Sequence, residues 1–301
     1  MIGIAQLTVF SFLVIGLIYA FLKRKEETKG NRFVKDWAPF LVLWLLYDQM
    51  RGIADNQDWI NVKPVYDVEK YIFGWMFGGQ IPNEWAQQDF IQNKFLSFFY
   101  AFIYTVHPIA PLLLAVLIYY KSNDREMFKE YSQSFLLTVY LALATFVFYP
   151  VAPPWYVEKH GFAQPEQLTG VGDSAAGLVD VDNYLGITAF TDFYRQFNAN
   201  PYAALPSLHA AFSFFVAYYA IYYYRSRIGR KIYWIIFYPF LVWTAAVYLN
   251  HHYIVDLLAG AAYSYVSIKL VRYYRKKRGI GAKVEPRSLD GTLPNAKAEE
   301  S

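Results

Sequence analysis

Two short stretches of this 301-residue chain hold three of its five histidines in positions suited to acid–base or nucleophilic chemistry. His251 and His252 are adjacent, and Asp256 follows His252 by four residues. On a helix, this spacing places the imidazole of His252 and the carboxylate of Asp256 on one face, within hydrogen-bonding reach. A carboxylate in that position fixes the ring tautomer and stabilises the imidazolium, so His252 is a candidate nucleophile and Asp256 its orienting group.

The second stretch, NPYAALPSLHAAFSFF, covers residues 200–215. Pro206 suits the first turn of a helix, where its missing N–H would have no partner. The free N–H groups of that turn, together with the Ser207 hydroxyl, predict an anion site. His209 could then protonate a leaving oxygen. A nucleophile, an acid and a phosphate site are what phosphoryl transfer requires, so we expect His209 and His252 to converge in space.

Simpler interpretations exist for each element of this site. LPSLH is also an ordinary helix start, and His252 with Asp256 could be a structural polar pair. His251 beside a turn could be solvated, although we count it among the candidate substrate-binding residues. His107, close to two prolines, is interpreted as a helix-packing residue. Ionisable groups at the edge of a membrane are costly unless they are paired and used, which favours the catalytic interpretation.

Two further places could contact substrate. Arg51 follows Asp48 by three residues, so it could form a local helical ion pair or bind a phosphate headgroup. The stretch YPVAPPWY, residues 149–156, predicts a helix end because two adjacent prolines cannot continue a helix. Trp155 and Tyr156 within it are candidates for a wall of the site.

The stretches APPWY, LPSLH and HHYIVD resemble three signatures of the type 2 phosphatidic acid phosphatase superfamily, and particularly its inositol phosphorylceramide synthase-like branch. The resemblance extends from about residue 47 to residue 271. It implies that His252 is the nucleophile, that Asp256 orients it and that His209 is the acid. It also implies chemistry without a metal or other cofactor.

Departures from the superfamily pattern bear on the reaction. Many phosphatase members carry a lysine and an Arg-Pro pair in the first signature and an arginine six residues before the nucleophile. Here the first signature reads Ala-Pro-Pro at residues 152–154, and the later position is Ala246; Leu208 replaces a glycine. The missing cations would grip a highly charged phosphate monoester, so their loss favours transfer involving a phosphodiester lipid.

The elements that position these residues are apolar helices. The composition is 56% hydrophobic and 17% charged, and several apolar runs reach the length needed to cross a bilayer. We therefore predict an all-α, polytopic membrane helical bundle of about seven transmembrane helices, in which the family pattern implies a six-helix core plus one N-terminal helix. The expected spans are Ile2–Leu22, Trp37–Ile53, Lys94–Lys121, Phe128–Tyr149, Leu205–Tyr224, Ile232–Leu249 and Tyr253–Val271.

Basic residues follow the first, third, fifth and seventh of these spans, whereas residues 150–200 are rich in acidic side chains. The positive-inside rule then places the N-terminus outside, the C-terminus in the cytoplasm and the histidines at the outer side. We divide the chain into a retained anchor helix and basic loop (1–36), a catalytic membrane domain (37–273) and a basic tail predicted to be disordered (274–301). The catalytic domain includes an interfacial segment (56–93), interpreted as a structural lid, and an outer loop (150–200).

These features predict a multi-pass membrane enzyme. It would transfer a phosphoryl or phospho-headgroup from a lipid phosphate to an alcohol, such as inositol, through a phosphohistidine. The alternatives are a lipid phosphate phosphatase that uses water, and a proton-coupled transporter whose His and Asp side chains relay protons. The net charge of +4 is explained by basic blocks beside the spans, where they face anionic lipid, and no nucleic-acid motif is present. With no cysteine, thiolate chemistry is excluded.

Overall fold

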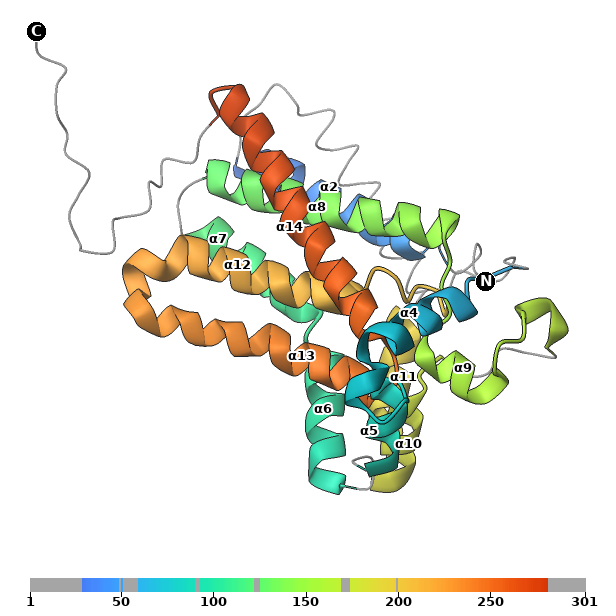
Figure 1. Ribbon diagram of the computed structural model, residues 1–301. Coiled ribbons are helices and arrows are strands. Elements are labelled where there is room, and N and C mark those ends of the chain that lie inside the picture. The colour runs from blue at the N-terminus through green and yellow to red at the C-terminus, as the bar shows by residue number, and fades with distance from the viewer. Residues whose placement is uncertain are drawn as a thin grey trace, which may run out of the picture.

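The computed structural model describes residues 29–48, 50, 59–89, 93–121, 125–168, 174–198 and 200–280 (Figure 1). Within those ranges the chain is helical, and its extended pairings are isolated bridges that join Val151 to Asn61 and to Ala203. The helices are α2 (Lys29–Asp48), α4 (Lys63–Phe73), η1 (Gly74–Met76), α5 (Pro82–Asp89), α6 (Lys94–Val106), α7 (Ile109–Lys121), α8 (Arg125–Phe148), α9 (Pro154–His160), η2 (Pro165–Gln167), α10 (Gly177–Leu185), α11 (Ala189–Phe197), α12 (Leu208–Ile228), η3 (Gly229–Ile236), α13 (Phe237–Tyr248) and α14 (Ile254–Lys277).

Three helical stretches are long and apolar enough to cross a membrane: Arg125–Phe148, Leu208–Tyr248 and Ile254–Lys277. The pair α6 and α7 is a fourth if its 48° bend lies within one span. The stretch Leu208–Tyr248 folds back on itself, because α13 returns beside α12 (Figure 1) and the Trp243 indole donates to Ser213 Oγ at 3.1 Å. The chain is therefore an all-helical protein with helices that can span a membrane.

The expected number of seven spans is not confirmed by this count. The first, Ile2–Leu22, lies outside the described residues, and α2 ends at Asp48, within the second. The third is bent between α6 and α7, at His107 and Pro108. Figure 1 shows α6 turning away from the direction of α7 there. Pro108 accounts for the bend, since proline lacks the N–H that would continue the helix.

The core surrounds α12, which packs against α7, α8, α13 and α14. Aromatic side chains fill the space between α8 and α12: Tyr131, Phe215 and Tyr219 are fully buried, and their rings meet edge to face. Their hydroxyls are satisfied inside the bundle, because Tyr131 donates to the Pro111 carbonyl and Tyr219 to Ser134 Oγ. Such rings combine large apolar area with a polar tip that needs a partner.

The crossing of α12 and α14 depends on Gly260. A Cβ atom at this position would overlap the carbonyl oxygen of Ser207 at the start of α12. One turn further along α14, Ser264 Oγ donates to the Ala211 carbonyl at 2.9 Å. Small residues allow two membrane helices to approach this closely. The contact brings the starts of α12 and α14 together, and these starts carry His209 and His252.

Charged clusters hold the opposite end of the bundle. Arg275 of α14 is buried and donates to Glu126 of α8 at 2.7 Å. One turn earlier, Arg272 lies 3.5 Å from the Glu130 carboxylate and donates to the Tyr222 hydroxyl at 2.6 Å. These contacts tie the ends of α8, α12 and α14 at the side away from the histidines.

Candidate active site

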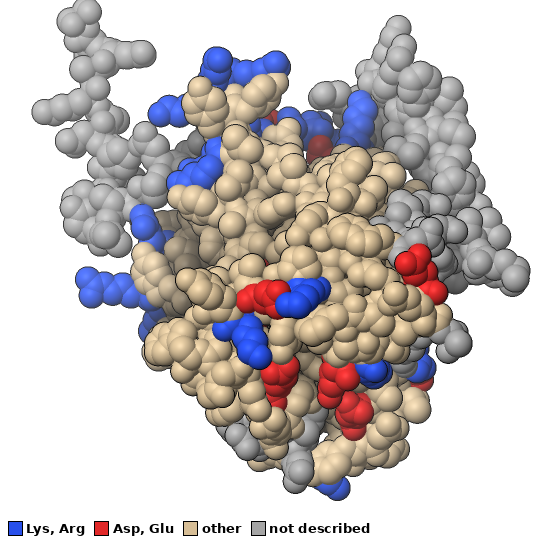
Figure 2. Space-filling view, turned by 45° about the vertical axis from the view of Figure 1, so that its right-hand side comes forward, with Lys and Arg blue, Asp and Glu red and all other residues tan. Residues whose placement is uncertain are grey.

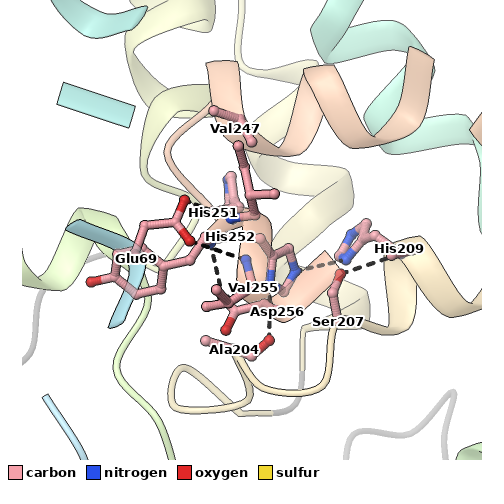
Figure 3. A network of polar contacts seen from close by, with 12 residues as sticks. Glu69, Ala204, Ser207, His209, Val247, His251, His252, Val255 and Asp256 are labelled. Carbon is pink, nitrogen blue, oxygen red and sulfur yellow. Dashed lines mark hydrogen bonds and ion pairs between the residues drawn. The ribbon is translucent and has the colours of Figure 1, made fainter. Parts of the chain in front are cut away.

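The two catalytic candidates meet where α12 and α14 begin (Figure 3). His252 Nε2 and His209 Nδ1 are 3.1 Å apart. Both side chains are brought there by helix starts, because His252 precedes α14 by two residues and His209 is the second residue of α12. The convergence expected from the sequence is therefore observed.

The hydrogen bonds assign the tautomers of both rings. His252 Nδ1 lies 3.1 Å from the Ala204 carbonyl, which can only accept, so Nδ1 carries the hydrogen. In the neutral ring Nε2 then holds a lone pair. His209 Nδ1–H must donate to that lone pair across the 3.1 Å contact. The site thus presents an unprotonated nitrogen on one ring opposite an N–H on the other.

Asp256 contacts both the start of α14 and the ring of His252. Its Oδ2 accepts from the Tyr253 N–H at 2.9 Å, which caps α14, and the same atom lies 3.7 Å from His252 Nδ1. That separation is an electrostatic contact and not a hydrogen bond. Asp256 is fully buried, and its Oδ1 has no hydrogen-bond partner among the residues that the structure describes. The carboxylate is therefore placed to stabilise positive charge on His252, while the hydrogen bond to Nδ1 belongs to Ala204.

The Ala204 carbonyl was not anticipated from the sequence. An extended bridge places it: Ala204 N donates to the Val151 carbonyl at 3.4 Å, and Val151 N donates to the Tyr202 carbonyl at 2.9 Å. Val151 comes directly before the APPWY stretch. The segment of the first signature is therefore linked to His252, the candidate nucleophile, through the main chain. No side-chain type at position 204 could have signalled this role.

Ser207 and Pro206 form the entry to α12. Ser207 is the N-cap, fully buried, and its Oγ accepts from Ala210 N at 3.3 Å. Its own N–H donates to the Asp256 carbonyl at 3.0 Å, which joins the starts of α12 and α14. Pro206 lies before the cap and not within the first helical turn, where we had expected it.

An aromatic enclosure around His209 was also not anticipated. The Tyr104 ring stacks on the His209 ring at 4.1 Å with an interplanar angle of 8°, and its hydroxyl lies 3.4 Å from His209 Nδ1. His107, at the bend after α6, lies 4.6 Å from His209 between ring centroids. His107 also donates to the Tyr104 carbonyl at 2.6 Å. It packs between helices as expected, but its neighbour is the candidate acid.

The remaining candidates that the structure describes are His251, Trp155 and Tyr156. His251 contacts the segment between α9 and α12: its Nε2 donates to the Ala175 carbonyl at 3.1 Å, and its Nδ1 is 3.3 Å from the Tyr194 hydroxyl. Trp155 and Tyr156 are buried in a separate apolar cluster, which also contains Ile60 and Tyr202. The Trp155 N–H donates to the Asn250 carbonyl, so this segment supports the turn that precedes His252. Arg51 lies outside the described residues.

The turn between α13 and α14 is held by backbone bonds. The N–H groups of His251 and His252 both donate to the carbonyl of Ala246, at 3.0 and 3.3 Å. Asn250 adopts a left-handed conformation with φ of 62°, and its side-chain amide donates to Glu158 at 2.5 Å. Asparagine tolerates this backbone region better than most residues. Position 246 thus supports the candidate nucleophile with its carbonyl and carries no cationic side chain.

Among the residues that the structure describes, no three His, Asp or Glu side chains are grouped so that they could hold a metal ion.

Comparison with known proteins decides the family. A family model for the PAP2 superfamily matches residues 79–270, a range that contains His209, His252 and Asp256. The chain belongs to this superfamily. The resemblance described above for the three sequence signatures is thereby confirmed, and the range covers α5 through most of α14.

Curated relatives indicate the branch. The chain is 33% identical over 237 residues to the phosphoinositol dihydroceramide synthase of Bacteroides thetaiotaomicron, covering 74% of this chain and 71% of that protein. It is 31% identical over 125 residues to the inositol phosphorylceramide synthase catalytic subunit of Saccharomyces cerevisiae, covering 42% of this chain and 29% of the yeast protein. For the inositol phosphorylceramide synthase of Candida albicans the identity is 27% over 168 residues, covering 56% and 34%.

These matches place the chain in the inositol phosphorylceramide synthase-like branch of the PAP2 superfamily. It is an integral membrane enzyme of lipid phosphotransfer. The matched stretches span about a third of each fungal protein. No solved structure matches the chain.

Proposed function

We propose that this enzyme moves a phosphate-linked headgroup from a phosphodiester lipid to an alcohol, through a covalent phosphohistidine at His252. The observation that carries this proposal is the 3.1 Å contact between His252 Nε2 and His209 Nδ1, with the Ala204 carbonyl behind the nucleophilic ring. A lone pair and an acidic N–H that point at one place are what an in-line displacement at phosphorus needs.

In the first step the substrate phosphorus enters between the two rings. The Nε2 lone pair of His252 attacks it, the N–P bond forms, and the bond from phosphorus to the lipid oxygen breaks. With the anionic phosphodiester bound, His209 carries hydrogens on both ring nitrogens, and its Nδ1 gives one proton to that departing oxygen. His252 becomes an imidazolium and keeps its Nδ1 hydrogen on the Ala204 carbonyl, and the Asp256 carboxylate at 3.7 Å stabilises the positive charge.

In the second step His209, now neutral and lacking its Nδ1 proton, takes the proton of the acceptor hydroxyl. The acceptor oxygen attacks phosphorus and the N–P bond breaks. The acceptor proton restores the charged form of His209, and His252 returns to its neutral form with the hydrogen on Nδ1. Water in place of the alcohol would give hydrolysis, so the outcome depends on which hydroxyl occupies the site.

The relatives' names guide the choice of substrates. A phosphoinositol dihydroceramide synthase joins a phosphoinositol group to a ceramide-type lipid, and the fungal relatives are named for a similar product. We take the donor to be an inositol phospholipid and the acceptor to be the hydroxyl of a ceramide-type lipid. The reverse allocation would have free inositol attack a ceramide phosphodiester and displace that lipid's headgroup alcohol. The absence of cationic side chains at residues 152–154 and 246 suits a singly charged diester.

We further propose that the described helices belong to a bundle with the site at the outer membrane surface and the basic ends in the cytoplasm. Six spans would form the core and the N-terminal run a seventh. The support is the charge distribution along the sequence. The position of Arg275 and Glu126 at the end of the bundle away from the histidines agrees with it.

The test uses the purified protein in mixed micelles with labelled lipids. One arm offers phosphatidylinositol, labelled in its inositol, with dihydroceramide. A second offers a ceramide phosphodiester, ceramide phosphoethanolamine, with labelled inositol. A third offers each donor with water alone. We expect a labelled inositol-phosphate ceramide in the first arm. Product in the second arm alone would reverse the donor assignment. Free phosphate or inositol phosphate as the only product in every arm would favour a phosphatase and overturn the transfer proposal.

A further inference from the structure

A buried carboxylate from outside the family-matched residues caps the helix that carries the nucleophile. Glu69 lies on α4, before residue 79, and its side chain is 0% exposed. Its Oε1 accepts from the Ile254 N–H at 2.9 Å, and its Oε2 accepts from the Val255 N–H at 3.0 Å. These are the first two residues of α14. Figure 3 shows the Glu69 carboxylate directed at this helix start, beside His252.

The placement of Glu69 is costly for the protein. The pKa of Glu69 is raised to about 7, mainly by burial and to a smaller extent by the charge of Asp256, while the two backbone hydrogen bonds act in the opposite direction. A buried carboxylate is tolerated where it meets N–H groups and the positive end of a helix. A helix start can also be capped by a local serine or aspartate, as Ser207 caps α12. Glu69 lies 185 residues before Ile254 in the sequence, so its hydrogen bonds to α14 fix the start of that helix relative to α4.

The same segment holds the other side of the turn. The Asn83 side-chain amide on α5 donates to the carbonyls of Val247 and His252, both at 3.1 Å. The Gln87 amide donates to the Tyr248 carbonyl at 2.7 Å. The residues from the end of α13 to the start of α14 are therefore bonded to α4 and α5 through both N–H and carbonyl groups. This segment, which we interpreted as a lid, braces the turn that carries His252.

We propose that Glu69 is a positioning residue: by holding the Ile254 and Val255 N–H groups it fixes the start of α14, and with it His252 and Asp256, against His209. The proposal rests on the proposed function, since it takes His252 Nε2 as the reacting atom. A nucleophile displaced by about 1 Å can lose on the order of a hundredfold in rate, because alignment with phosphorus is lost. Glu69 does not touch substrate, so substrate binding should change little.

The test compares Glu69→Gln with the matched control Glu84→Gln. Glu84 lies in the same segment, but its carboxylate accepts from the Tyr66 hydroxyl at 2.9 Å and from Ile81 N at 3.2 Å, so it caps α5 and not α14. We expect Glu69→Gln to lower kcat for headgroup transfer about 10- to 100-fold with KM changed less than threefold. Glu84→Gln should stay within about threefold of the parent. If Glu69→Gln fails to insert, Glu69→Asp, which keeps the charge but is shorter, should show the same loss in kcat.

Amide hydrogen exchange provides a readout that does not depend on turnover. Glu69→Gln should speed exchange at Ile254 and Val255 at least tenfold and leave the middle of α14 unchanged. Parental kcat in this variant would overturn the proposal, whether or not exchange rises, because the cap would then be only structural. A parent protein inactive with every lipid would instead contradict the proposed function, and the exchange result alone would decide whether Glu69 holds the turn.

Discussion

Two oxygen atoms lie next to His252 Nδ1, and they have different roles. The Ala204 carbonyl at 3.1 Å makes the hydrogen bond that selects the tautomer, and it acts while the ring is neutral. The Asp256 carboxylate lies 3.7 Å from the ring, beyond hydrogen-bonding distance, and in the proposed mechanism its charge stabilises the ring once an N–P bond makes that ring cationic. Because the site is buried, a charge–charge interaction there is screened less than in water. We therefore assign orientation mainly to the carbonyl and transition-state stabilisation to the carboxylate.

At the residue scale, Glu69 predicts a pH-dependent change in stability. Its pKa is raised from 4.5 to about 7 in the folded protein. The stabilisation from the protonated form is fully present below pH 4.5 and is lost as the pH rises through 7, because the folded state then loses a proton that it binds more tightly than the unfolded state. The difference of about 2.5 pKa units corresponds to about 3 kcal/mol.

Glu69→Gln removes this titration, so melting temperatures should reveal it. Between pH 5 and pH 8 the gap between the variant and the parent should shift by several degrees in favour of the variant. The control Glu84→Gln, measured over the same range, corrects for changes in the detergent and in other carboxylates. A gap that stays constant with pH would mean that Glu69 does not titrate between these values.

The residues of the site differ in how far sequence could predict them. His209, His252 and Asp256 were found because their types are chemically distinctive and their spacing fits a helix start. Ala204 contributes a carbonyl, which every residue has, and Tyr104 is one of 28 tyrosines in the chain. Glu69 is 185 residues from its partner. No local pattern links it to α14.

At the element scale, the α12–α14 crossing positions the two histidines. Gly260 allows it, since a Cβ there would overlap the Ser207 carbonyl, and backbone cannot move aside as a flexible side chain can. We expect Gly260→Ala to separate the helix starts, to destabilise the protein by about 1 to 3 kcal/mol and to lower transfer activity.

Gly74→Ala is the matched control for this change. A Cβ at Gly74 would meet its nearest atom, Lys70 Cγ, at 3.4 Å, which is an ordinary contact. Thermal unfolding in detergent and the headgroup-transfer assay should show a larger loss for Gly260→Ala than for Gly74→Ala. Equal effects of the two substitutions would show that the α12–α14 crossing can accommodate a Cβ atom at position 260, which would contradict this interpretation.

The elements themselves were predicted to different degrees. Apolar runs located α8, α12, α13 and α14, because lipid-facing and core-facing positions are both hydrophobic and the runs end in charged or proline-rich segments. The bend between α6 and α7 was missed even though Pro108 marks it. Hydropathy along a sequence indicates the length and composition of an apolar run, and it does not reveal a change in helix direction. The bracing role of α4 and α5 depends on tertiary contacts alone.

At the scale of the whole molecule, charge is distributed unevenly. Exposed basic residues gather at the ends of α12 and α14 away from the histidines, and exposed acidic residues gather at the end of the bundle that holds the site. In Figure 2 most blue side chains lie toward the upper and left edges, and most red ones lie lower. The acidic side chains include Asp67, Glu158, Glu166, Asp180 and Asp192. Such asymmetry supports the proposed orientation, with the site outside.

The absence of cysteine from the chain allows a direct test of this orientation. Lys159→Cys and Arg227→Cys each introduce a single thiol at an exposed position. Position 159 lies in α9, and position 227 lies near the end of α12. In intact cells, a membrane-impermeant maleimide should label the thiol at position 159. The thiol at position 227 should react only after the membrane is permeabilised. Labelling in the opposite order would invert the proposed topology.

The central claim is that His252 forms a bond to phosphorus, and a rapid-quench experiment tests it most directly. The protein is mixed with phosphatidylinositol labelled in its inositol, without acceptor, then quenched in alkali, where phosphohistidine survives, and analysed by peptide mass spectrometry. We predict a phosphoinositol adduct on His252 that disappears when dihydroceramide is added and is absent in His252→Ala, while His251→Ala still forms it. An adduct on His209 or His251, or undiminished product formation by His252→Ala, would contradict the account.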